Sequence, residues 1–190
     1  MSTLAPTIYA RTFPRAADWL RDVILIMLGT LFVAVLAQVK IPLPFTPVPL
    51  TGQTFAVLLI GATLGSKRGA ASMLLYFALG AFGLPVFAGG ASGLAYLSGA
   101  TFGYLIGFVM AAYIIGLLAE RGLERNVRTS LIPFVVGTVI IYVCGIAWLA
   151  LILGNFNQAI TAGLLPFLLG DAVKLLAAAL VLPAAWKFVR

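Results

Sequence analysis

The sequence contains no histidine, one cysteine and few charged residues. Without histidine the chain cannot form a Ser-His-Asp triad, and its five acidic residues are scattered, which argues against a metal site. Cys144 has no second cysteine to pair with, and its position in an apolar run is typical of a small buried side chain. We therefore expect no enzyme activity, no metal and no cofactor.

Charge is scarce as well: 9% of the residues are charged and 63% are hydrophobic, whereas soluble domains carry about 25% charged residues. A chain of 190 residues cannot bury that much apolar surface in a core surrounded by water, so the excess must face lipid. The composition predicts an all-α integral membrane protein with a single membrane domain.

Six apolar segments are candidates for transmembrane helices, of which the second is short. They cover about 23–39, 53–65, 70–84, 102–119, 131–153 and 163–189. We predict an N-terminal cytoplasmic or interfacial segment over residues 1–20, followed by a six-helix membrane domain over residues 21–190.

The basic residues predict the orientation. With six spans, ten of them fall on one side: Arg11, Arg15, Arg21, Lys67, Arg68, Arg121, Arg125, Arg128, Lys187 and Arg190. The positive-inside rule then places both termini in the cytoplasm. Lys40 alone lies on the outer side, and Lys174 lies within a span. Because the basic residues form no single stripe, the net charge of +7 does not indicate nucleic-acid binding.

The start of the chain allows several interpretations. A basic region, an apolar run and "VLAQ" resemble a signal peptide cleaved after Ala37. Alternatively, residues 12–22 lie along the inner membrane surface with Phe13, Trp19 and Leu20 in the interface. Residues 1–10 are equally compatible with a disordered tail.

The outward connections are more elaborate than the short basic inner loops. "KIPLPFTPVPLTGQ" (40–53) carries four prolines, so it is stiff and extended. Residues 83–104 are rich in glycine, which lets backbone approach a ligand, and carry aromatic residues that can cover an apolar one, such as Phe87 and Tyr96. The third connection, 154–163, is short. This asymmetry indicates capture of something from outside.

Small residues recur at four-residue spacing in two places, namely Gly61 and Gly65, and Gly103, Gly107 and Ala111. Such rows allow helices to pack closely in lipid. We expect them to mediate packing inside the bundle.

Asp171 and Lys174 lie inside the last span, one helical turn apart and therefore on one face. If that helix enters the membrane near Pro166, they lie about 8 and 12 Å deep. A charge at mid-bilayer costs about 2.5–3.5 kcal/mol, so intramembrane ionisable residues indicate a functional site. Two alternatives stay open: the pair neutralises itself and locks the helix, or it belongs to a proton relay. A ligand site carrying both donors and acceptors is our main interpretation.

Four motifs, in this order, make the chain resemble a known family. They are "PVPLTGQTFAVLLIGATLG" (47–65), "LGAFGLPVFAGGASGL" (79–94), "GATFGYLIGF" (99–108) and "GDAVKLL" (170–176). The sequence resembles the BioY family, the biotin-specific substrate-binding (S) components of energy-coupling factor vitamin transporters. Ala100 is a departure, since family members commonly carry proline there.

The resemblance implies biotin as the ligand and places Asp171 and Lys174 beside it. Asp171 would accept a ureido N–H of biotin, and Lys174 would donate to a biotin oxygen. Weaker candidates for polar contacts are Gln53 and Tyr142. Gly89 and Gly90 would let the second outer loop close over the ring.

The resemblance also implies partners: a transmembrane coupling subunit and two cytoplasmic ATPases, in a bacterial cytoplasmic membrane. No segment reads G-x-x-x-x-G-K-[ST], so this chain has no such ATP-binding loop. The docking row of small residues on the first helix of such subunits is matched here by Thr30 and Ala34. Biotin would be captured outside and released inside.

Three rival functions stay open. The same architecture serves other vitamins, such as thiamin or riboflavin, and a solitary biotin facilitator would have the same sequence pattern. An intramembrane enzyme is the weakest, because Ser72, Ser92 and Ser98 have no base in a matching motif.

Overall fold

A computed structural model describes residues 3–14 and 17–189, which fold almost entirely into helices. The elements are α1 (Leu4–Thr12), α2 (Asp18–Ala37), β1 (Lys40–Ile41), β2 (Leu50–Thr51), α3 (Gln53–Leu64), α4 (Ser66–Ala81), α5 (Leu94–Leu97), α6 (Phe102–Glu120), η1 (Leu123–Arg125), α7 (Val127–Leu153), α8 (Phe156–Gly163), η2 (Leu165–Phe167) and α9 (Leu168–Val189). Arg15 and Arg190, two of the basic residues used above to predict orientation, lie outside the described residues.

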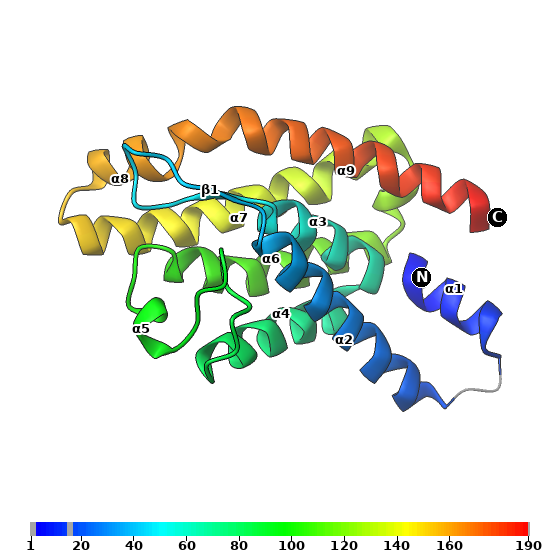
Figure 1. Cartoon of the computed structure of the whole chain (residues 1–190). Helices are drawn as coiled ribbons and strands as arrows, with labels where there is room; N and C mark the ends of the chain where they lie inside the picture. The colour runs from blue at the N-terminus through cyan, green and yellow to red at the C-terminus, as the bar shows by residue number, and fades with distance from the viewer. Residues whose placement is uncertain (1–2, 15–16, 190) are drawn as a thin grey trace.

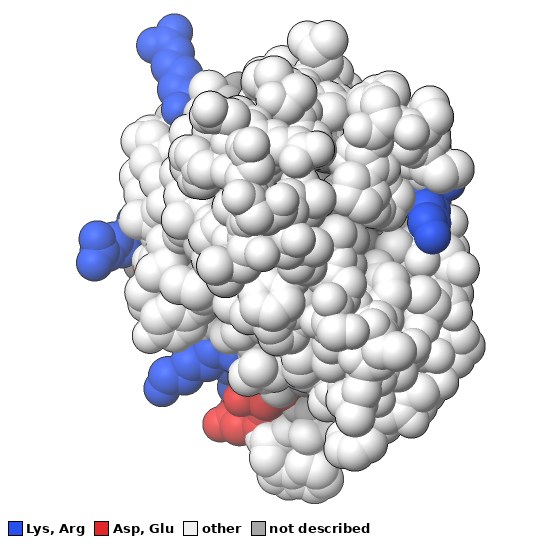
Figure 2. Space-filling model, turned by 90° about the vertical axis from the view of Figure 1, so that its left-hand side faces the viewer, with Lys and Arg blue, Asp and Glu red and all other residues white. Residues whose placement is uncertain are grey.

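The bundle has two distinct ends. Figure 1 shows α1 and the last turns of α9 at one end, which we call the terminal end. The opposite end, which we call the loop end, is formed by residues 38–52, 82–101 and 154–167, with α5, α8 and the antiparallel pair β1–β2 among them. Figure 2 looks onto the loop end, and the middle of that face is uncharged.

The centre of the bundle is the short helix α3. Its 12 residues rise about 18 Å, less than the roughly 30 Å of a bilayer core. It packs against α2, α4, α6 and α9, and most of its residues are buried. The neighbouring helices therefore bury the short second apolar segment, in keeping with a helix that is apolar on all sides.

The predicted rows of small residues do mediate packing between helices. A Cβ atom at Gly61 of α3 would lie 2.9 Å from the carbonyl oxygen of Ala112 in α6. A Cβ atom at Gly103 of α6 would lie 2.4 Å from the carbonyl oxygen of Cys144 in α7. Larger side chains at these positions would push the helices apart.

Helix boundaries differ from the apolar segments, mostly at the N-terminal ends. Three helices begin earlier than predicted, with Asp18 in α2, Ser66 in α4 and Val127 in α7 as first residues. Their first turns carry polar or basic side chains, which are helical but not apolar, so hydropathy does not reveal them. The third outward connection, 154–163, contains a helix that the sequence did not predict, α8, and the last long helix begins at Leu168 rather than near 163.

The alternative of a disordered tail at residues 1–10 is wrong for residues 4–10, which belong to α1. Leu4 and Pro6 are buried, and α1 packs against α2 and α3. Residues 1 and 2 lie outside the described part. Phe13, Trp19 and Leu20 are exposed, as the interfacial interpretation requires.

Four helical stretches in the described part are long and apolar enough to cross a membrane: Asp18–Ala37, Phe102–Glu120, Val127–Leu153 and Phe156–Phe188. Helices α3 and α4 are shorter, with 12 and 16 residues. Helix length by itself therefore supports a multi-pass membrane protein without fixing six spans.

Candidate ligand site

A cavity lies beneath the loop end, between α3, α6, α7 and α9. Its walls are mainly apolar and aromatic, and its polar groups come from six elements, β2, α3, α5, α6, α7 and α9. The lining residues are Val48, Pro49, Leu50, Thr51, Gln53, Thr54, Ala88, Tyr96, Thr101, Tyr104, Leu105, Phe108, Ile141, Tyr142, Phe167, Asp171 and Lys174. Apolar walls with a few converging polar groups are typical of small-molecule sites.

Asp171, 8% exposed, is the main acceptor in this cavity. Its Oδ1 accepts hydrogen bonds from the Lys174 ammonium at 2.8 Å and from the Thr54 hydroxyl at 3.0 Å. Its Oδ2 accepts one from the Tyr142 hydroxyl at 2.5 Å. The carboxylate is thus held by side chains from α3, α7 and α9, and its charge is compensated inside the bundle.

Lys174 uses its three donors within the protein. Besides Asp171, its Nζ reaches the backbone carbonyl of Thr51 at 2.7 Å and the Thr54 hydroxyl at 2.9 Å. A ligand oxygen that accepts from Lys174 must therefore displace one of these partners, because an ammonium has three donors.

Gln53, at the start of α3, is buried and lies in the same cavity. Its Nε2 donates to the Tyr76 hydroxyl at 2.8 Å, and its Oε1 accepts from the Thr51 hydroxyl at 3.1 Å. The expected polar contact to a ligand is compatible with this position, since the amide borders the cavity.

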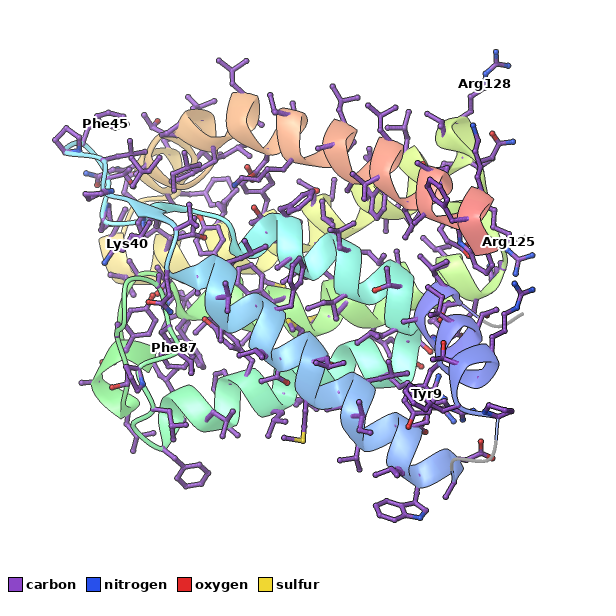
Figure 3. The ribbon with its side chains drawn as sticks, turned by 45° about the vertical axis from the view of Figure 1, so that its right-hand side comes forward. Tyr9, Lys40, Phe45, Phe87, Arg125 and Arg128 are labelled. Atoms are coloured by element: carbon purple, nitrogen blue, oxygen red, sulfur yellow. The ribbon has the colours of Figure 1, made fainter. Side chains whose placement is uncertain are left out.

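Tyr96 of α5 lines the cavity, and Phe87 stands behind it. The two rings stack with centroids 4.9 Å apart, and Phe87 meets Tyr76 edge-on at 5.5 Å. Figure 3 shows Phe87 within the loop end of the molecule. Phe87 is therefore a buried support for Tyr96 rather than a lining residue. Burial raises the pKa of the Tyr96 phenol.

Gly89 and Gly90 lie outside the lining of the cavity, and both have positive φ, of 70° and 79°. The Gly89 N–H donates to the carbonyl of Ala37 at the end of α2, at 3.1 Å. A Cβ atom at Gly89 would lie 2.6 Å from Cδ of Lys40. The two glycines thus fit this loop against α2 and the Lys40 side chain.

Thr30 does not lie on an exposed docking face. It is 4% exposed, and its hydroxyl donates to the carbonyl oxygens of Ile26 and, across to α4, Ser72 at 3.0 Å. Ala34 is half-buried. The expectation placed both residues toward a partner, but close packing of α2 on α4 turns Thr30 inward.

Sequence reasoning missed Thr51 and Thr54, and it noted Tyr104 only as one of the aromatic residues of 83–104 that can cover an apolar ligand. Thr54 follows Gln53 inside one of the quoted motifs, yet its contact with Asp171 joins residues 117 positions apart. Tyr104 lines the cavity and donates to the carbonyl of Gly163 at 2.7 Å, which fixes α6 to α8. No local pattern in the sequence reveals such contacts.

Comparisons with known proteins agree with this architecture. A family model described as the BioY family matches residues 7–190. The chain belongs to the BioY family. A protein of Pyrococcus horikoshii called "Probable biotin transporter BioY" is 43% identical over 161 residues, covering 85% of this chain and 93% of that protein. The "Biotin transporter BioY" of Thermotoga maritima is 40% identical over 157 residues, covering 83% and 92%.

A solved structure supports the same fold for this BioY chain. The crystal structure of an S-component for biotin from an ECF-type ABC transporter superimposes with a TM-score of 0.82 at 26% identity. The match covers 90% of this chain and 95% of that one. The helical bundle is therefore that of an S-component, as the sequence motifs predicted.

Proposed function

We propose that this protein takes up biotin, capturing it at the loop end and passing it to the opposite side of the membrane. The observation that carries the proposal is the Asp171–Lys174 pair with Tyr142 and Thr54, set in an apolar cavity of a BioY fold. Biotin has a ureido ring with two N–H donors and one carbonyl acceptor, beside an apolar thioether ring and chain. The polar cluster suits the ureido ring, and the apolar walls of the cavity suit the thioether ring and the chain.

Asp171 is proposed to accept a ureido N–H, and Lys174 to donate to a biotin oxygen. A buried ion pair by itself contributes little stability, and two apolar residues would avoid its desolvation cost. Retaining both charges beside a cavity is therefore better explained by a ligand that exchanges hydrogen bonds with them. Tyr96, Gln53 and Tyr104 would border the ligand from the other sides.

The proposed topology has six spans, both termini in the cytoplasm and the loop end outside. Helix α1 and the C-terminal turns of α9 lie at the same end of the bundle (Figure 1). An even number of membrane crossings requires the two ends of the chain to lie on the same side. Arg125 and Arg128 lie at this terminal end, as Figure 3 shows, and basic residues favour the cytoplasmic side. The protein would then be a multi-pass component of a bacterial cytoplasmic membrane.

Energy is proposed to come from a transmembrane coupling subunit and two cytoplasmic ATPases. Because Thr30 is buried, the coupling subunit would meet α2 on the face that includes half-buried Ala34 and the exposed residues Leu31 and Val35.

Calorimetry with purified protein in detergent tests the ligand. We expect tight one-site binding of biotin and none of thiamin or riboflavin. Binding of another vitamin in place of biotin would keep the S-component architecture and overturn the substrate. Uptake of labelled biotin in cells with and without the ATPases then separates a driven transporter from a solitary facilitator, which would transport equally in both.

A further inference from the structure

The loop end carries a single formally charged side chain. Residues 38–52, 82–101 and 154–167 contain Lys40 and no other lysine, arginine, aspartate or glutamate. Figure 3 shows Lys40 at this end, far from Arg125 and Arg128. Figure 2 shows that the middle of this face is uncharged and that the charged side chains in view stand around its outline. A single cation on an otherwise uncharged face attracts an anion without competition from neighbouring charges.

Lys40 borders a vestibule that adjoins the cavity. Pro42 and Thr46 line this vestibule with it, and Pro49, Tyr96 and Thr101 line both the vestibule and the cavity. The two spaces therefore share a wall of three residues. To occupy the cavity with one end and the vestibule with the other, a ligand with a long chain would have to pass these three residues.

The backbone and a glycine fix the position of Lys40. In the β1–β2 ladder Lys40 is the Cα partner of Thr51, whose carbonyl accepts from Lys174. The aliphatic stem of Lys40 passes over Gly89, where a Cβ atom would lie 2.6 Å from Cδ and 3.3 Å from Nζ of Lys40. Among residues 3–14 and 17–189, no acidic side chain forms an ion pair with Lys40.

The charges of the cavity are already balanced. Asp171 and Lys174 neutralise each other at 2.8 Å. A ligand carboxylate placed beside them would add one uncompensated negative charge in a buried site, which is costly. A neutral ring adds no charge there. The same carboxylate placed beside exposed Lys40 keeps water and gains a counter-charge.

We propose that Lys40 receives the carboxylate of the ligand in the vestibule, while the uncharged ureido ring occupies the cavity at Asp171 and Lys174. This subsite rests on the proposed biotin function and assigns the two ends of the molecule. It also makes Lys40 the residue that distinguishes an anionic ligand from a neutral analogue and that attracts the anion during association.

The test compares biotin with neutral biotin amide, by calorimetry, on wild type, Lys40→Ala, Lys40→Arg and Lys174→Ala. Arg128→Ala is the matched control, since it removes one charge at the terminal end. We expect Lys40→Ala to weaken biotin roughly 3- to 10-fold and to leave the amide unchanged, as for a partly hydrated ion pair. Lys40→Arg should retain the preference for biotin, and Lys174→Ala should weaken both ligands alike.

Equal losses for biotin and its amide in Lys40→Ala overturn the subsite. So does a selective loss of biotin in Lys174→Ala with none in Lys40→Ala, which would place the carboxylate in the cavity. Wild type that binds neither ligand overturns the proposed biotin function, and this subsite with it. Stopped-flow association adds an independent measure: the rate for biotin should fall with ionic strength in wild type and much less in Lys40→Ala.

Discussion

The Lys174 ammonium donates a 2.7 Å hydrogen bond to the backbone carbonyl of Thr51, 123 residues earlier in the chain. This contact ties the last helix to the strand that precedes α3 and lies directly beside the cavity. Lys174 therefore fastens the loop end to the bundle, and under the proposed function a ligand oxygen would take the place of one of its three partners. The two roles are separable, because stability and affinity are measured independently.

Removing the charge of either Asp171 or Lys174 should lower both the stability of the protein and its affinity for biotin. Lys174→Ala leaves the Asp171 carboxylate with hydroxyl partners only, and Asp171→Asn leaves the ammonium without its counter-charge. Breaking such a pair costs about 3–5 kcal/mol of stability, and we expect an affinity loss of about 30-fold or more. Thermal unfolding and calorimetry measure the two effects. Controls are Arg128→Ala and Asp18→Asn, whose carboxylate is 86% exposed. A stability loss with unchanged affinity would make the pair purely structural.

The double variant Asp171→Asn/Lys174→Met removes both charges and keeps similar side-chain volumes. We expect its melting temperature to recover most of the loss seen in the single variants, because no unpaired charge stays buried. Biotin affinity should stay low, since the ligand loses its ionic partners. Restored binding in this variant would argue against a role for the charges in recognition.

Tyr142→Phe tests the 2.5 Å hydrogen bond to Oδ2 of Asp171. A hydrogen bond to a charged group contributes about 1.5–3 kcal/mol, so we expect a measurable loss of stability or a roughly tenfold or greater loss of biotin affinity. Tyr113→Phe is the matched control, because Tyr113 is 43% exposed on α6. Identical behaviour of the two variants would exclude a contribution from the Tyr142 hydroxyl.

Gly89→Ala should disturb the subsite of Lys40. Its φ of 70° makes any side chain strained, by about 1–3 kcal/mol, and its Cβ atom would also displace the Lys40 stem. Gly83→Ala carries the same kind of strain at φ 99°, but its Cβ atom meets nothing within 4 Å. We expect both variants to lose stability and Gly89→Ala alone to lose preference for biotin over its amide, measured by calorimetry.

Replacing each of two glutamates near the terminal end by glutamine should shift the melting temperature in opposite directions. Burial raises the pKa of Glu124, which is 0% exposed and lies 3.7 Å from Nε of Arg125. A carboxyl with a raised folded pKa favours folding below its unfolded pKa, and that stability is lost as pH rises through the folded pKa. Glu124→Gln should therefore raise the melting temperature at pH 8, and the gain should shrink toward pH 4.

Glu120 provides the contrast. Its Oε1 accepts from the backbone N–H and the hydroxyl of Ser66, at 2.7 and 2.8 Å, at the N-terminus of α4. A carboxylate there satisfies an unpaired N–H and interacts favourably with the helix dipole, so Glu120→Gln should cost about 1 kcal/mol at neutral pH. A melting curve at pH 8 that shifts both variants in the same direction would contradict this assignment.

Much of the fold could be predicted because it depends on local composition. Apolar length located every long helix, and spacing placed Asp171 and Lys174 on one face. Polar first turns, such as the one that begins at Asp18, were not predicted because they are helical without being apolar. Helix α1 was not predicted because its burial depends on contacts with α3, which lies far along the chain.

The sequence by itself determined the class of protein, since scarce charge and absent histidine leave few alternatives, and it marked the buried pair. Only the tertiary structure decided the partners of that pair. Thr51, Thr54 and Tyr142 reach it from three different elements, and such contacts depend on helix packing rather than on spacing. Packing also turned Thr30 inward against Ser72 and laid Lys40 over Gly89. The rotation of each helix is set by its neighbours, and a one-dimensional pattern does not contain it.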